Sequence, residues 1–328
     1  MLNELKDITM GKSRLSYIGA AHGVLTHAGL WEGDIAELAG LTGLAFQFVV
    51  HESFCPSSVT VYDWAAVHFA AMDRIGVYTD CLSAVLQPGL NTADDLQEDA
   101  VKRIRESIDR GRGVVLWAPT PLLEFGIITG YDDEERIFSV IDCINTHPDP
   151  LLYDNLGRGE VPMLYLQRFF SRRQVDEEKL HRDALCAGVF SWRSIHPDPR
   201  YGRGLQAYDN MLSSLKARNF DPFGTGYCLA VYADAKNAAS GFIKKAAASG
   251  LINGLDGVSE RMERTASHFR AAADLVPFRG PQGTTVDPEK IPDLIKHLKE
   301  CRRLEQEVMD ELADRLGIDE PVRDISAQ

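Results

Sequence analysis

The stretch GRGVVLWAPTPLLEFGIITGYDDEERIFSVID, from Gly111 to Asp142, decides the fold. Apolar, β-forming runs at 113–118, 124–130 and 136–142 are separated by the turn-forming segments TPLL and YDDEE. Runs of this length that end at Gly, Pro or Asp are typical of strands. The acids of the second turn are consecutive, whereas a calcium loop needs ligands at alternating positions and a glycine at its bend. We therefore interpret this turn as a solvated hairpin between neighbouring strands.

The segments on either side of these strands follow other periodicities. Helical spacing and glycine termini predict helices over 16–27, 32–40, 63–76 and 94–110. Asp63 is the expected N-cap of the third of these helices. The run LAFQFVV predicts a strand over 44–50, and a further strand is expected over 161–166. Helices that come first and strands that cluster later favour an α+β fold over a doubly wound parallel sheet.

After about residue 175 the pattern becomes helical throughout. Four long segments have helical periodicity, with apolar stripes such as Leu294, Leu298 and Leu312: these are YGRGLQAYDNMLSSLKAR, LAVYADAKNAASGFIKKAAAS, GLDGVSERMERTASHFRAAADLV and DPEKIPDLIKHLKECRRLEQEVMDELADRLG. We predict an α+β domain over 1–175 and a helical domain over 176–328 that packs on it.

Composition and charge exclude several functional classes. The 328 residues are 45% apolar and 25% charged, as in an ordinary globular protein. The net charge of -13 argues against nucleic-acid partners and anionic membrane surfaces, which both require clustered Lys and Arg. The sequence contains no run of about 18 apolar residues, so we expect no membrane span. Six scattered cysteines without a CxxC pair predict free thiols in a cytoplasmic protein and argue against a zinc site. We expect no metal and no cofactor.

Four motifs together resemble one known family. They are GAAHGVLTHAGL, LAGLTGLAFQF, EFGIITGYDDEERIFSVID and GLQAYDNML, and they span most of the chain. In these motifs the chain resembles the papain-like proteins related to the butirosin biosynthesis H protein and to C39-like peptidases. The resemblance implies a nucleophilic Cys at the start of the first helix, a His at the start of a strand, and an Asp or Asn one strand later. It also implies acyl transfer or amide hydrolysis through a thioester.

Two of the three implied catalytic positions depart from the family pattern. Asp142 matches the orienting acid, but Glu124 occupies the His position, and Ser16 lies where the Cys is expected. Such a site requires a thiolate, an imidazole that holds the proton and an acid that orients the imidazole. We therefore expect a catalytically degenerate protein that binds a small-molecule or peptide ligand in the inherited cleft. Glu124 and Asp142 are the expected polar anchors, and Trp117 and Tyr131 the expected aromatic lining.

Two alternatives stay open at this point. Cys55 follows His51 by four residues in HESFCPSS, so an acyltransferase or amide hydrolase of a biosynthetic pathway could use Cys55 or Ser16 as its nucleophile. The other interpretation of this motif is a structural thiol beneath a proline-containing loop, with His51 at the end of the preceding strand. The second alternative is a structural protein that forms a homo-oligomer through its helical domain.

Overall fold

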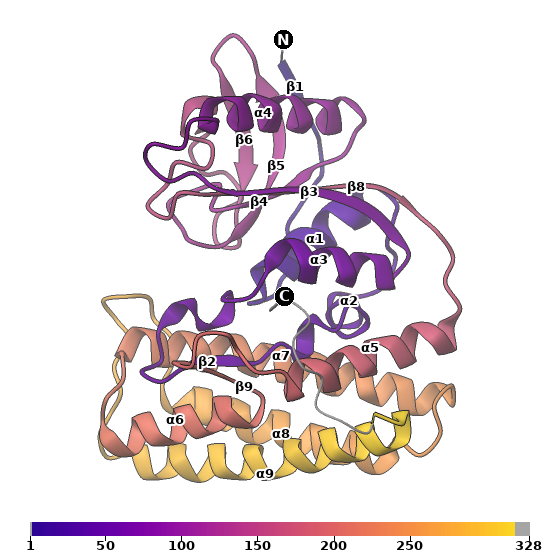
Figure 1. The fold of residues 1–328 in the computed structure, drawn as a ribbon, viewed down its shortest axis with the longest axis vertical. Coiled ribbons are helices and arrows are strands. Elements are labelled where there is room, and N and C mark those ends of the chain that lie inside the picture. Colours follow the sequence, from indigo (N-terminus) through magenta and orange to yellow (C-terminus); the bar gives the residue numbers. More distant parts are fainter. Residues whose placement is uncertain (1, 319–328) are drawn as a thin grey trace. The chain divides into compact units, whose positions relative to one another are not determined.

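A computed structural model describes residues 2–318 of the chain. The chain divides into two compact units, the first made of Met1–Leu38 with Asp63–Gln174 and the second of Ala39–Tyr62 with Val175–Gln328. The fold is mixed α+β, with an antiparallel sheet in the first unit and a bundle of long helices in the second (Figure 1).

The first unit is built on a seven-stranded sheet in which every neighbouring pair of strands is antiparallel. Along the main path the strands are β3 (Val77–Val85), β8 (Met163–Arg172), β4 (Val114–Trp117), β5 (Phe125–Asp132), β6 (Ile137–Ile141) and β7 (Leu151–Leu152), while β1 (Leu2–Glu4) pairs with β5. The three strands predicted between 113 and 142 are thus confirmed as β4, β5 and β6. β8 starts within the strand expected over 161–166 but extends further, and β3 was not predicted.

Helices cover both faces of this sheet (Figure 1). α4 (Ala93–Asp109) lies over one face, where Ile104 packs in a core with Leu116 and Leu166. α1 (Ser16–His27) and α3 (Trp64–Arg74) lie on the other face, where Tyr17 and His68 contact Phe125. All three helices were predicted. Asp63 caps α3 as expected, because its carboxylate accepts the backbone N–H of Ala66 at 3.0 Å.

The second unit is mainly helical. It contains α5 (Glu177–Arg193), α6 (Leu205–Ala217), α7 (Pro222–Ser249), α8 (Asp256–Leu275) and α9 (Ile291–Leu316) (Figure 1). The last four of these correspond to the four predicted helical segments. α2 (Ile35–Leu41) spans the point where the chain passes from the first unit to the second.

The strand predicted over 44–50 is wrong in most of its length. Leu44–Phe46 forms a 3-10 turn (η1), and only the short strand β2 (Val49–His51) follows, paired with β9 (Tyr201–Arg203). Leu44, Phe46 and Phe48 are all buried, so the run is apolar because it is enclosed on every side. A short apolar run of this kind does not distinguish a strand from other buried backbone.

A buried ion pair lies in the middle of the helical unit. Lys236 of α7 donates from Nζ to Oε1 of Glu305 on α9 at 2.5 Å, and both side chains are 1% exposed. Oε2 of Glu305 accepts the Tyr208 hydroxyl at 2.6 Å, and the ammonium group lies 4.0 Å from the ring centroid of Phe48. Three helices and the segment before β2 therefore meet at a single charged pair.

Removing only one of these charges should destabilise the second unit strongly. In Lys236→Met the Glu305 carboxylate stays buried without its cation, which typically costs about 3–5 kcal/mol. Urea unfolding should show this loss, and Lys236→Met/Glu305→Leu should recover part of it. Lys244→Met, on the same helix but 69% exposed, is the matched control and should change the free energy of unfolding by about 0.5 kcal/mol or less. A single Lys236 variant as stable as this control would contradict the argument.

Candidate functional site

Ser16 and Glu124 are joined directly. Ser16 is the first residue of α1, and Glu124 immediately precedes β5. The Ser16 hydroxyl donates to Oε2 of Glu124 at 2.5 Å and accepts the backbone N–H of Phe125 at 3.2 Å. Ser16 is buried and Glu124 is partly exposed. The carboxylate thus lies beside the N-terminus of a twelve-residue helix, where the helix dipole favours negative charge.

This geometry limits what Ser16 can do chemically. Its proton is directed at Glu124, and its oxygen already accepts the Phe125 amide. A carboxylate with a reference pKa of about 4.3 is a weak base toward a hydroxyl group. The pair is therefore well suited to holding α1 against β5 and poorly suited to generating an alkoxide.

Asp142 follows β6 directly, and both of its carboxylate oxygens are engaged within the surrounding loops. Oδ1 accepts the backbone N–H groups of Ile144 and Asn145 at 2.8 and 2.7 Å, and Oδ2 accepts the Thr120 hydroxyl at 2.9 Å. These contacts close the turn after β6 and attach it to the loop between β4 and β5. Asp142 is buried, and these bonds give it a role in fixing the loops.

Cys143 lies close to both acids, although sequence reasoning did not select it. Partial burial of the thiol, followed by the negative charges of Glu124 and Asp142, raises the pKa of Cys143 to about 12. The residue as a whole is exposed. At neutral pH its sulfur is an uncharged thiol and not a nucleophilic thiolate. The only signal in the sequence is its position next to Asp142.

A layer of aromatic side chains lies beneath Ser16 and surrounds Phe125. His68 stacks on Tyr17 with ring centroids 3.4 Å apart, and its Nδ1 is 2.9 Å from the Tyr165 hydroxyl. Tyr17 in turn donates to Oε1 of Gln167 at 2.7 Å. Burial lowers the pKa of His68 well below its ordinary value, so the ring is neutral. Sequence reasoning missed His68, although its spacing of four residues from Trp64 puts both on the same side of the predicted helix.

Trp117 and Tyr131 lie on opposite faces of the sheet. Trp117 joins the aromatic layer, 4.6 Å from Trp64 and 5.0 Å from Phe125 between ring centroids. Tyr131 is fully buried in the core under α4 and donates its hydroxyl to Asp109 at 2.7 Å. The pairing of β5 with β6 shifts register between Ile128 and Gly130, and this irregularity reverses the faces of the residues that follow. Tyr131 is therefore not brought together with Glu124.

Cys55 and His51 belong to the second unit. His51 ends β2, as expected, and its Nδ1 lies 3.1 Å from the backbone N–H donor of Ser53 and 2.9 Å from the Ser53 hydroxyl. The Cys55 sulfur lies 3.0 Å from Oγ of Ser57, which is 2.9 Å from the Tyr201 hydroxyl. Cys55 is thus partly buried beside hydroxyl groups, while the imidazole of His51 is engaged with Ser53.

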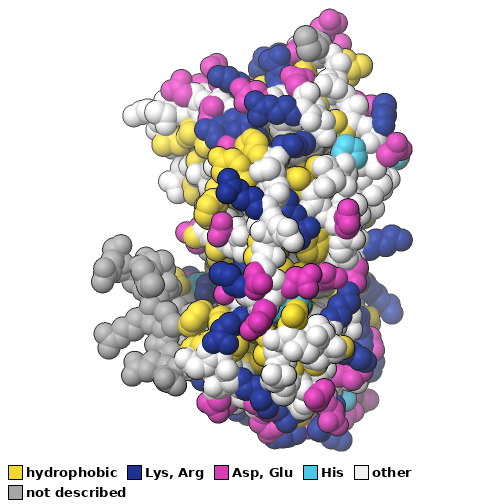
Figure 2. All heavy atoms as spheres, turned by 90° about the vertical axis from the view of Figure 1, so that its right-hand side faces the viewer, with side chains coloured by type: hydrophobic (Ala, Val, Ile, Leu, Met, Phe, Trp, Pro, Cys, Tyr) yellow, Lys and Arg dark blue, Asp and Glu magenta, His cyan; other side chains and the backbone are white. Residues whose placement is uncertain are grey.

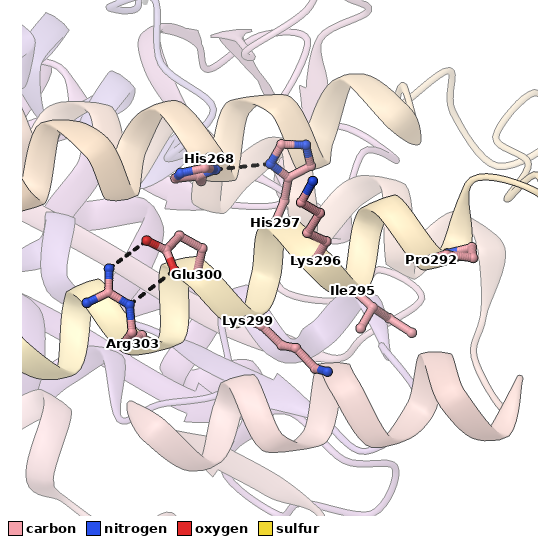
Figure 3. Close-up of a pocket in the computed structure, with 8 residues that line it drawn as sticks. All are labelled: His268, Pro292, Ile295, Lys296, His297, Lys299, Glu300 and Arg303. Carbon is pink, nitrogen blue, oxygen red and sulfur yellow. Dashed lines mark hydrogen bonds and ion pairs between the residues drawn. The ribbon is translucent and has the colours of Figure 1, made fainter.

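A shallow pocket of about 580 Å³ lies along α8 and α9 (Figure 3). Two histidines face each other there, with Nδ1 of His268 3.1 Å from Nδ1 of His297. Burial, and then His268 and Lys296, lower the pKa of His297. Lys299 points away from this pair, and Arg303 is bound to Glu300. The charges that line the pocket therefore do not converge on one point.

Two kinds of functional element are absent from the described residues 2–318. Within this range no group of three or more His, Cys, Asp or Glu side chains has an arrangement that could hold a metal ion. None of the helices described there is long and apolar enough to cross a membrane. Acidic and basic side chains are interspersed over the face drawn in Figure 2.

The raised pKa of Cys143 predicts slow alkylation. At pH 8, iodoacetamide should modify this residue at least about a hundredfold more slowly than free cysteine, because the thiolate is the reacting species. Glu124→Gln removes one of the negative charges that raise this pKa and should accelerate modification about three- to tenfold. Glu135→Gln, in the exposed turn between β5 and β6, is the control and should leave the rate unchanged. Peptide mapping after timed quenching measures these rates, and modification of wild-type Cys143 at the rate of free cysteine would contradict the prediction.

The sequence matches no family model, and no curated protein is significantly similar to it.

Proposed function

We propose that the first unit is a papain-like domain, related to the butirosin biosynthesis H protein and C39-like peptidases, that has lost catalysis and binds a small molecule or peptide beside Glu124. The order of the key positions supports this proposal. Ser16 begins α1, Glu124 precedes β5, and Asp142 follows the next strand, β6. This is the order of nucleophile, base and orienting acid that the resemblance implies.

The observation that carries the proposal is the hydrogen bond between Ser16 and Glu124. A cysteine protease-like site needs a thiol and an imidazole at these two positions, and removing either member typically costs several powers of ten in rate. Here a buried hydroxyl and a carboxylate take their places, and the nearby Cys143 thiol stays protonated. These groups favour binding over nucleophilic catalysis.

The charges and apolar groups around Glu124 indicate the class of ligand. Glu124 and Asp142 both raise the pKa of the Cys143 thiol, and the opposing effect of the Arg14 cation is smaller than either. The local charge is therefore negative. Leu123, which precedes Glu124, is 38% exposed, and Ile144, two residues after Asp142, is 79% exposed. A primary amine or guanidinium group on an apolar body complements both features.

An NMR titration with hexylammonium as the probe tests this assignment. Binding should shift the methyl resonances of Leu123 and Ile144, and Glu124→Gln should weaken it about tenfold, equivalent to about 1.4 kcal/mol. Glu135→Gln should bind as the wild type does, and hexanol, which has the same apolar chain without the charge, should bind more weakly. Identical affinities for the wild type and Glu124→Gln, or no methyl shifts at all, would refute the assignment of this site.

A further inference from the structure

β3 is an edge strand with one unused side. It pairs with β8 over all nine of its residues, Val77–Val85, and residues 2–318 provide no strand on its other side. In an antiparallel sheet about half of the backbone N–H and C=O groups of such a strand point outward. These groups form a template on which another extended chain can pair.

β3 lacks two of the protections that natural proteins place on edge strands. Its sequence, VYTDCLSAV, contains no lysine and no proline. The irregularity in its pairing leaves the extra residue, Phe170, on β8 and does not interrupt β3. Its one charged side chain, Asp80, is bound by Arg168 through two contacts of 2.5 and 2.9 Å. The edge is therefore neutral and continuous.

The side chains of β3 are complementary to those of a second, antiparallel copy of the same strand. The register that uses all nine residues puts Cys81 opposite its own counterpart and Val77 opposite Val85. In the same register Thr79 faces Ser83, which is a favourable hydroxyl pair, Tyr78 faces the small Ala84, and Asp80, whose charge Arg168 balances, faces Leu82. Tyr78 and Val85, 62% and 53% exposed, would each gain a partner.

We propose that two copies of this protein associate through β3, antiparallel and with Cys81 at the two-fold axis, to join their sheets. A strand that pairs with its own copy in this way makes an isologous contact, as two-fold dimers require. This interface lies on the first unit, whereas the oligomer expected from the sequence would form through the helical domain. It does not depend on the ligand proposed for Glu124.

Sedimentation equilibrium of the full chain between about 1 and 200 μM measures this association. The wild type should dimerise, and Ser83→Lys/Val85→Lys, which adds the charges that protect natural edges, should weaken the dimer at least about tenfold. Ser213→Lys, at an exposed position on α6, is the control and should not alter it. Circular dichroism and thermal unfolding of the double variant check that it remains folded.

Two further measurements test the interface itself. Hydrogen exchange within 77–85 should slow as the protein concentration rises, and a short bis-maleimide should yield a Cys81–Cys81 peptide. A wild type that is monomeric at 200 μM would overturn the proposal. A dimer that the lysine substitutions do not weaken, or whose 77–85 amides exchange at the same rate at all concentrations, would also overturn it.

Discussion

The hydrogen bond between Ser16 and Glu124 ties the start of α1 to the start of β5, and the geometry of the candidate site depends on it. A hydrogen bond to a charged group typically contributes about 1.5–3 kcal/mol. Ser16 also accepts the backbone N–H of Phe125, and this bond fixes Phe125, the residue at the centre of the aromatic layer. Tyr17, the residue after Ser16, then stacks on His68 and reaches Gln167. This partly buried polar contact is thereby connected to buried side chains of α1, α3 and β8.

A nucleophilic site needs a proton that can move, and in this site the protons are already engaged. Ser16 uses both its proton and an acceptor position, Asp142 is occupied by one hydroxyl and two amides, and the Cys143 thiol keeps its proton because ionisation beside two acids is unfavourable. The one imidazole in the aromatic layer, His68, is buried and bound to Tyr165. These properties fit the binding role proposed above, in which the polar groups would hold their positions before a ligand arrives.

Local patterns made much of this architecture predictable, and long-range pairing explains most of the failures. Apolar β-forming runs and turn residues identified β4 to β6, and a polar N-cap identified α3, because those signals lie within a few residues. The strand predicted over 44–50 was mostly wrong for two reasons. The partner strand β9 lies about 150 residues away, and burial on all sides removes any periodicity from the segment. Tyr131 was misplaced because an irregularity in β5 reverses its face. The proximity of Ser16 to Glu124 came from the family resemblance, whereas the contacts of Cys143 and His68 depend on packing that the sequence does not display.

The central claim is that Ser16 and Glu124 form a fixed structural pair and not a catalytic dyad. The most direct measurement is treatment of the folded protein with a fluorophosphonate, which modifies activated serines, followed by peptide mapping of the segment that contains Ser16. The account predicts no modification of Ser16 beyond that of exposed serines such as Ser213, in the wild type and in Glu124→Gln alike. Rapid, stoichiometric modification of Ser16 that Glu124→Gln abolishes would show that the carboxylate activates the hydroxyl, and would contradict the account.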